Sequence, residues 1–203
     1  MNVIFLIPLV AAAAAAAQSP ARDSVVYELV PSSRLVVRTG KAGLLGFAGH
    51  EHLIQARELS GHIVYFPNQP ASSSVTVSIA TPRLEVLTPP DTAEIRKVTA
   101  AMRVDVLDVA HYPEITLTSQ SVEAVGDTLR VRGALTMKGQ TRTVPLVVRV
   151  RIEPDTLRAT ATFKVRQSDY GIRPYRGGPG GTVRVADAVT FEIDAVALRR
   201  PPR

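Results

Sequence analysis

The stretch Leu129–Glu153, LRVRGALTMKGQTRTVPLVVRVRIE, decides the fold class. Apolar and polar side chains alternate along both halves of it, so that Leu135 and Met137 share one face while Arg130 and Arg132 share the other. A period of two is typical of β-strands with one dry and one wet face. Such strands belong to antiparallel sheets, because parallel strands are usually buried on both faces. The stretch therefore predicts an antiparallel hairpin that turns at Lys138–Thr141.

The same alternation recurs along most of the chain. It is clearest at Leu157–Arg166, where Ala159, Ala161 and Phe163 share a face, and at Val189–Leu198. Further strands are expected at 25–38, 52–57, 59–67, 73–81 and 115–124. Eight or more strands joined by short turns favour closure into an up-and-down barrel. The predicted fold class is thus all-β, an antiparallel β-barrel.

One segment breaks the alternation and predicts a short helix. Thr88-Pro89-Pro90 ends the strand before it, and Asp91 is placed to cap a helix, with Glu94 as its capping-box partner. A helical face follows at Ile95, Val98 and Met102. The helix is expected to end before His111-Tyr112-Pro113, because a residue that precedes proline avoids the helical region.

The N-terminus resembles an export signal. Residues Met1–Ala17 are apolar and end in a run of alanines that offers cleavage sites between small residues. We therefore expect a signal peptide at 1–17, a single domain at 18–203 with its core at about 25–198, and localisation in the periplasm. An uncleaved N-terminal anchor is the alternative. The absence of cysteine agrees with export but does not decide it.

The net charge of +6 gives little support for a nucleic-acid partner. The arginines alternate with apolar residues along the strands, as at Arg132 and Arg149, so they are expected on a solvated face. Aromatic residues are few, and no basic cluster is interleaved with them as a base-stacking surface requires. Transient attraction to anionic lipid headgroups at a membrane surface fits this charge better.

The stretch Gly43–Ile54, GLLGFAGHEHLI, combines glycines, apolar side chains and a His-x-His pair. Three glycines permit close backbone approach, so the stretch suits either a mouth over an apolar cavity or a tight bend. On a strand, His50 and His52 would point to the same side, a spacing also found in metal sites. The alternative is a polar pair that bonds a ligand headgroup.

Five segments in register resemble the YceI family of bacterial envelope lipid-binding proteins. They are VVRTGKAGLLGFAGHEHLI, ELSGHIVYFP, VLDVAHYPEI, VRGALTMKGQTRTVPLVV and SDYGI. The resemblance implies an extended lipocalin-like antiparallel barrel with one short helix over it. It also implies an elongated interior that holds a polyisoprenoid, an isoprenoid quinone or another long-chain lipid. The family's usual first-strand tryptophan is absent, and Tyr27 stands in a similar place.

The expected ligand-binding residues lie on the dry faces and in the glycine-rich stretch. They are Leu44, Leu45, Phe47, His50, His52, Ile63, Tyr65, Ile79, Met102, Leu117, Leu135, Met137, Leu146, Phe163, Tyr170 and Phe191. Patterning alone favours side chains that fill a small barrel, whereas the resemblance implies a hollow lumen.

No catalytic motif accompanies these residues. The chain has no G-x-S-x-G elbow, no H-E-x-x-H and no cysteine nucleophile, so we expect a binding protein, not an enzyme, with no cofactor and no bound metal. The alternative is a metal-binding protein or metal-dependent hydrolase centred on His50 and His52. Self-association as a homodimer is left open.

Overall fold

The computed structural model describes residues 24–42, 51–87, 92–177 and 183–201. Its strands are β1 (Val25–Leu29), β2 (Arg34–Ala42), β3 (Leu53–Ala56), β4 (Leu59–Tyr65), β5 (Ser74–Ala80), β6 (Leu84–Val86), β7 (Glu114–Val125), β8 (Thr128–Met137), β9 (Gln140–Ile152), β10 (Thr156–Arg166), β11 (Arg176–Gly177) and β12 (Val183–Arg199). Its helical segments are η3 (Pro70–Ser72), η4 (Thr81–Arg83), α1 (Thr92–Ala101), η5 (Met102–Val106) and η6 (Gln167–Tyr170).

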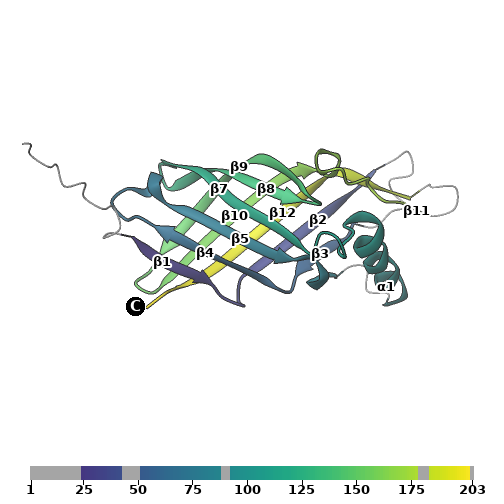
Figure 1. Cartoon of the computed structure of the whole chain (residues 1–203), viewed down its shortest axis with the longest axis horizontal. Coiled ribbons are helices and arrows are strands. Elements are labelled where there is room, and N and C mark those ends of the chain that lie inside the picture. Colours follow the sequence, from purple (N-terminus) through teal and green to yellow (C-terminus); the bar gives the residue numbers. More distant parts are fainter. Residues whose placement is uncertain (1–23, 43–50, 88–91, 178–182, 202–203) are drawn as a thin grey trace, which may run out of the picture.

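The strands form an antiparallel barrel, which confirms the predicted fold class. The order β1-β4-β5-β7-β8-β9-β10-β12 closes on itself because β1 pairs with β12 as well as with β4. Strands β2, β3 and β6 continue from β12 on the same side as β1. The barrel is elongated, with α1 and β11 at one end and β1 and the C-terminus at the other (Figure 1).

The turns follow from local backbone chemistry. Lys138 and Gly139, with φ of 47° and 71°, form the tight turn between β8 and β9. Gly126, with φ of 59°, turns the chain between β7 and β8. Positive φ at two consecutive positions matches the right-handed twist of the flanking strands. The predicted central hairpin is therefore present, and β9 begins at Gln140, inside the predicted turn Lys138–Thr141.

The single strand expected at 25–38 is wrong. The chain turns at Pro31-Ser32, so that β1 and β2 are separate strands. Between them the buried Ser33 donates from Oγ to the carbonyl of Val196 at 2.8 Å and accepts from the Val196 N–H at 3.0 Å. Pro31 has no backbone N–H to donate to a strand ladder. The Ser33 hydroxyl bonds the backbone groups of Val196, a residue with which neither β1 nor β2 pairs.

The helix lies over one end of the barrel, as predicted, and is followed by a π-helical turn. The apolar residues Ile95 and Val98 pack on the core, and the buried Met102 begins the π-turn η5. The helical segment ends at Val106, whose carbonyl accepts from Lys138 Nζ at 3.2 Å. Arg103 Nη2 donates to the carbonyl of Leu84 at 3.4 Å, so this segment also covers the edge strand β6. The proposed cap, Asp91, lies outside the described residues.

None of the helices in the described ranges is long and apolar enough to cross a membrane.

The core runs along the barrel axis and has two parts. The larger one holds Leu135, Leu146 and the stacked rings of Phe163 and Phe191, whose centroids lie 5.0 Å apart. The smaller one lies at the β1 end and holds Tyr27, Leu157 and Ala197.

Truncating the core should cost much more than truncating the outer wall. Leu135 is 2% exposed and Val147 is 58% exposed on the neighbouring strand. We expect Leu135→Ala to lower the free energy of unfolding by about 2–5 kcal/mol, and Val147→Ala to change it by less than about 0.5 kcal/mol. Urea denaturation of both variants measures the difference. Equal losses would contradict the assignment of inner and outer faces.

Candidate functional site: an apolar barrel lumen and a split in its wall

The barrel interior contains an apolar cavity of about 120 Å³. It is lined by Leu29, Ile63, Tyr65, Ser73, Ser74, Val75, Val77, Leu117, Val122, Leu129, Val131, Leu146, Val148, Val150, Leu157, Ala159, Thr160, Ala161, Ile193 and Ala195. Val148 and Ala161 face inward yet are only partly buried, because the empty space leaves part of their surface uncovered. The lumen is therefore hollow at this point.

A second apolar cavity of about 40 Å³ adjoins the first. It lies between Phe163 and Phe191 on one side and Ile79 and Leu135 on the other. Both cavities share the lining residues Leu29, Val77, Leu117, Ile193 and Ala195. The two spaces are thus successive parts of one lumen, separated by side chains.

The predicted ligand-binding residues lie in several different parts of the structure. Ile63, Tyr65, Leu117 and Leu146 line the larger cavity, and Ile79, Leu117, Leu135, Phe163 and Phe191 line the smaller one. Met102 and Met137 are buried in the core without lining either cavity. Tyr170 is buried at the barrel wall. Leu44, Leu45, Phe47 and His50 lie outside the described residues.

Several cavity residues were not among the predicted binding residues. Leu129, Ala159 and Ala195 share the dry faces of predicted strands, so the period of two was a sufficient signal for them. Val122 follows a bulge in β7 between Ser119 and Ser121, where the register shifts by one residue. A bulge reverses the alternation locally, and no feature of the sequence marks it.

The described histidines do not come together. The backbone N–H of His52 donates to Thr39 Oγ1 at 3.1 Å, His62 is exposed on β4, and His111 Nδ1 lies 2.8 Å from Asp108 Oδ1. Among the described residues, no group of three His, Cys, Asp or Glu side chains could hold a metal ion. Because His50 is outside those residues, the metal alternative stays a prediction.

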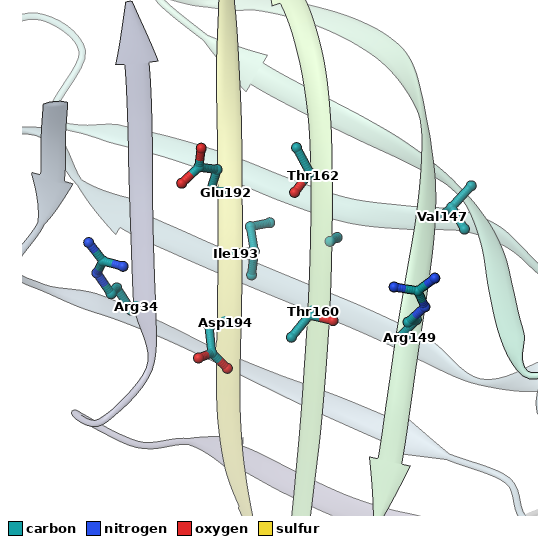
Figure 2. Close-up of a pocket in the computed structure, with 9 residues that line it drawn as sticks. Arg34, Val147, Arg149, Thr160, Thr162, Glu192, Ile193 and Asp194 are labelled. Carbon is teal, nitrogen blue, oxygen red and sulfur yellow. The ribbon is translucent and has the colours of Figure 1, made fainter. Parts of the chain in front are cut away.

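A polar groove of about 480 Å³ runs over the outer face of β9, β10, β12 and β2 (Figure 2). Its charges are largely balanced. Arg34 lies opposite Asp194 in the β2–β12 register, and Glu192, on the same strand, pairs with Arg38 at 3.1 Å. This groove therefore offers mixed polar side chains and no excess of one charge.

The ladder between β9 and β10 stops halfway along both strands. Leu157–Ala161 of β10 pairs with Val148–Ile152 of β9, but beyond Ala161 the strand pairs only with β12. Pro145 lies in the part of β9 that pairs only with β8, as expected of a residue confined to strand edges. The barrel wall is thus split between β9 and β10, toward the end where the β8–β9 turn contacts η5.

A groove of about 500 Å³ occupies this split, and we call it the β9–β10 groove. It is lined by Arg142, Thr143, Val144, Pro145, Lys164, Val165, Arg166, Asp169, Tyr170 and Ala188. Segment η6 sits beside it and is tied to β12, because Asp187 accepts from the Ser168 N–H at 2.9 Å and from Ser168 Oγ at 2.7 Å. These bonds from Ser168 lower the pKa of Asp187 below its usual range.

Tyr170 is 1% exposed, and its hydroxyl oxygen is buried with no hydrogen-bond partner. Burial raises the pKa of this phenol above 10.0, the Asp169 charge raises it further, and Arg142 opposes both effects. The hydroxyl therefore remains a neutral donor at physiological pH. Arg103 Nε, at the helix end of the barrel, is the other buried polar side-chain atom without a partner among the described residues.

Removing the Tyr170 hydroxyl should stabilise the free protein. A buried, unsatisfied polar group costs about 1–3 kcal/mol, so we expect Tyr170→Phe to raise the free energy of unfolding by about 1 kcal/mol. The difference between the two proteins should grow above pH 10. The pKa of the Tyr170 phenol is higher in the folded state than in the unfolded state, so the wild type loses stability as the unfolded phenol ionises, whereas Tyr170→Phe does not. Urea melts at neutral and alkaline pH measure both effects. Tyr27→Phe is the control, and a loss of stability in Tyr170→Phe would show that the hydroxyl is satisfied.

Comparison with solved structures supports the fold. BcnA of Burkholderia cenocepacia superposes with a TM-score of 0.64 at 19% identity, covering 81% of this chain and 95% of BcnA. The YceI protein of Campylobacter jejuni superposes with a TM-score of 0.57 at 14% identity, covering 73% of this chain and 85% of that protein. At these identities the likeness concerns the fold alone.

Sequence comparison identifies the family. Protein YceI of Escherichia coli O157:H7 and that of Shigella sonnei are each 33% identical to this chain over 90 residues. The matched part is 44% of this chain and 44% of the length of those relatives. The profile of the YceI-like domain matches residues 27–197, nearly the whole described chain. This protein therefore belongs to the YceI-like domain family.

Proposed function

We propose that this protein binds a long apolar amphiphile, a polyisoprenoid or an isoprenoid quinone, and carries it in the barrel lumen. The observation that carries the proposal is the pair of adjoining apolar cavities along the barrel axis. Burying hydrocarbon contributes about 25 cal/mol per Å² before the costs of association. An interior lined mainly by apolar side chains therefore favours a tail over a polar metabolite.

The lumen has to widen to hold a long tail. The two cavities are smaller than the about 300–1,000 Å³ of an ordinary ligand pocket. Flexible side chains occupy the remaining space: a Cβ added at Gly133 would lie 2.6 Å from Leu117 Cδ1 and 3.0 Å from Leu146 Cδ1. Both leucines line the larger cavity, so rotation of their ends changes the width of the lumen.

The proposed setting is the periplasm, where such a carrier would collect its ligand from a membrane surface. The apolar stretch Met1–Ala17 supports export. Strands β8, β9 and β10 contain eight lysines and arginines, all of them exposed, and no carboxylate. This excess of positive charge supports transient contact with anionic lipid. The cationic residues are Arg130, Arg132, Arg142, Arg149, Arg151, Arg158, Lys164 and Arg166. Each contributes about 1 kcal/mol of attraction near an anionic leaflet.

Filling the lumen should remove the ligand without unfolding the barrel. Ala161 lines the larger cavity, so we expect Ala161→Phe to abolish retention of lipid in protein purified from the envelope fraction. A phenylalanine placed in empty space should cost less than the about 1–3 kcal/mol of an overpacked solid core. Native mass spectrometry with organic extraction measures the lipid, and urea melts measure the stability.

The matched control is Thr162→Phe, which places the same side chain on the outer face of the same strand. It should leave the lipid content unchanged. Retention of lipid by Ala161→Phe, together with a large loss of stability, would place the ligand outside a solid core. A wild-type protein that yields no lipid on extraction would remove the basis of the proposal.

A further inference from the structure

The β9–β10 groove lies next to the apolar lumen. On β9 the inward residue Val144 lines the groove, and the next inward residue, Leu146, lines the larger cavity. On β10 the inward residue Val165 lines the groove, and Phe163 lines the smaller cavity. Neighbouring inward residues of both strands line the groove and the cavities, so only these apolar side chains separate the split in the wall from the lumen.

The outer rim of the same groove is cationic. Arg142 comes from β9, and Lys164 and Arg166 come from β10. Within the described residues none of the three forms an ion pair, although the polar groove beside them does balance its charges. The nearest carboxylates are Asp169, which lines the groove, and Asp187, which is held by Ser168. The rim therefore has an excess of positive charge.

The Tyr170 hydroxyl supplies an independent indication of a ligand. It belongs to a residue that lines the groove, it is buried, and it has no acceptor in the protein. A buried hydroxyl without a partner is costly, so native proteins rarely keep one without an external acceptor. The Arg142 charge acts on this same phenol. A neutral donor beside a cation suits an anionic acceptor.

We propose that the β9–β10 groove binds the phosphate-type anionic headgroup of an amphiphile whose tail lies in the lumen. Arg142, Lys164 and Arg166 neutralise the charge, and the Tyr170 hydroxyl donates a hydrogen bond to it. This inference rests on the proposed function, because the tail must occupy the apolar lumen. Val144 and Val165 also line the groove, and their apolar surface favours a ligand with a hydrocarbon part. A free anion gains no free energy from contact with such a surface.

The test compares three probes that separate headgroup from tail. Geranylgeranyl phosphate has both, geranylgeraniol has the same tail without the charge, and inorganic phosphate has the charge alone. The chain contains no tryptophan, so its fluorescence cannot report on binding. Affinities of the wild type for the three probes are therefore measured by calorimetry or native mass spectrometry. We expect the order phosphate ester, then alcohol, with inorganic phosphate much the weakest.

The variants Arg142→Gln, Lys164→Gln and Arg166→Gln are combined in one protein. A hydrogen bond to a charged group contributes about tenfold or more in affinity, so the triple variant should bind the phosphate ester at least about tenfold more weakly. Tyr170→Phe should also weaken it by about tenfold or more, because the lost hydrogen bond is one to a charged group. Neither protein should bind the alcohol more weakly. Thermal melts verify that both are folded.

The matched control replaces Arg130, Arg132 and Arg158 by glutamine. These residues are exposed on β8 and β10 but do not line the groove, and their replacement lowers the net charge by the same amount. Equal weakening by both triple variants would show general attraction to a cationic face and overturn the headgroup site. Tight binding of inorganic phosphate alone would assign the groove to a free anion instead. If the ester and the alcohol bind equally well to every variant, the inferred headgroup site is wrong and the proposed function stands. If neither probe binds to the wild type, the proposed function itself is wrong.

Discussion

The barrel depends on the shared pairing of β12. Along one edge this strand pairs with β10 from Ala188 to Leu198. Along the other edge it pairs first with β2 and then, from Ala197 to Arg199, with β1. A strand that serves two neighbours in succession needs a change of partner without unsatisfied backbone groups. Ser33 provides it, because its hydroxyl bonds both backbone groups of Val196 at the point of change.

The opposite wall is constructed differently. Strand β12 has bonded neighbours on both edges, whereas β9 and β10 pair only over Val148–Ile152 and Leu157–Ala161. Pro145 lies in the part of β9 that does not pair with β10. An unbonded edge inside a closed barrel would expose donors and acceptors to aggregation or strand exchange. Here η6 lies beside the split, and the Ser168–Asp187 bonds fix it to β12. The split is thus flanked by the chain's own 3-10 turn, which leaves the groove open beside it.

Sequence alone predicted the parts of the fold that alternation determines. The strands from Leu129 to Ile152, their tight turn and the helix itself follow from local patterns of two and 3.6 residues, whereas its place over the barrel was implied by the resemblance. The division of 25–38 into two strands was missed, since it depends on a tertiary bond from Ser33 to Val196. The length of β12 was also missed, because its first residues pair with β2 and β11 and show no clear alternation.

The site was less predictable than the fold. Dry-face residues such as Leu117 and Phe163 line the lumen as alternation suggests, but whether side chains fill it depends on how opposite walls meet. Tyr170 was expected to bind the ligand, and in the structure it is buried with an unsatisfied hydroxyl. No local pattern reveals an unbonded edge, because each strand remains regular. The split is a property of the pairing, which only the three-dimensional structure defines.

The two ends of the lumen differ in chemistry, and under the proposed function this difference would orient a bound amphiphile. The β1 end is closed by the apolar cluster of Tyr27, Leu157 and Ala197, beside the larger cavity. The helix end contains both buried polar side-chain atoms that lack partners in the described chain, Arg103 Nε and the Tyr170 hydroxyl. A hydrocarbon tail gains most at the first end, and a polar headgroup loses least at the second. An amphiphile in this barrel would therefore lie with its tail toward β1 and its headgroup toward α1.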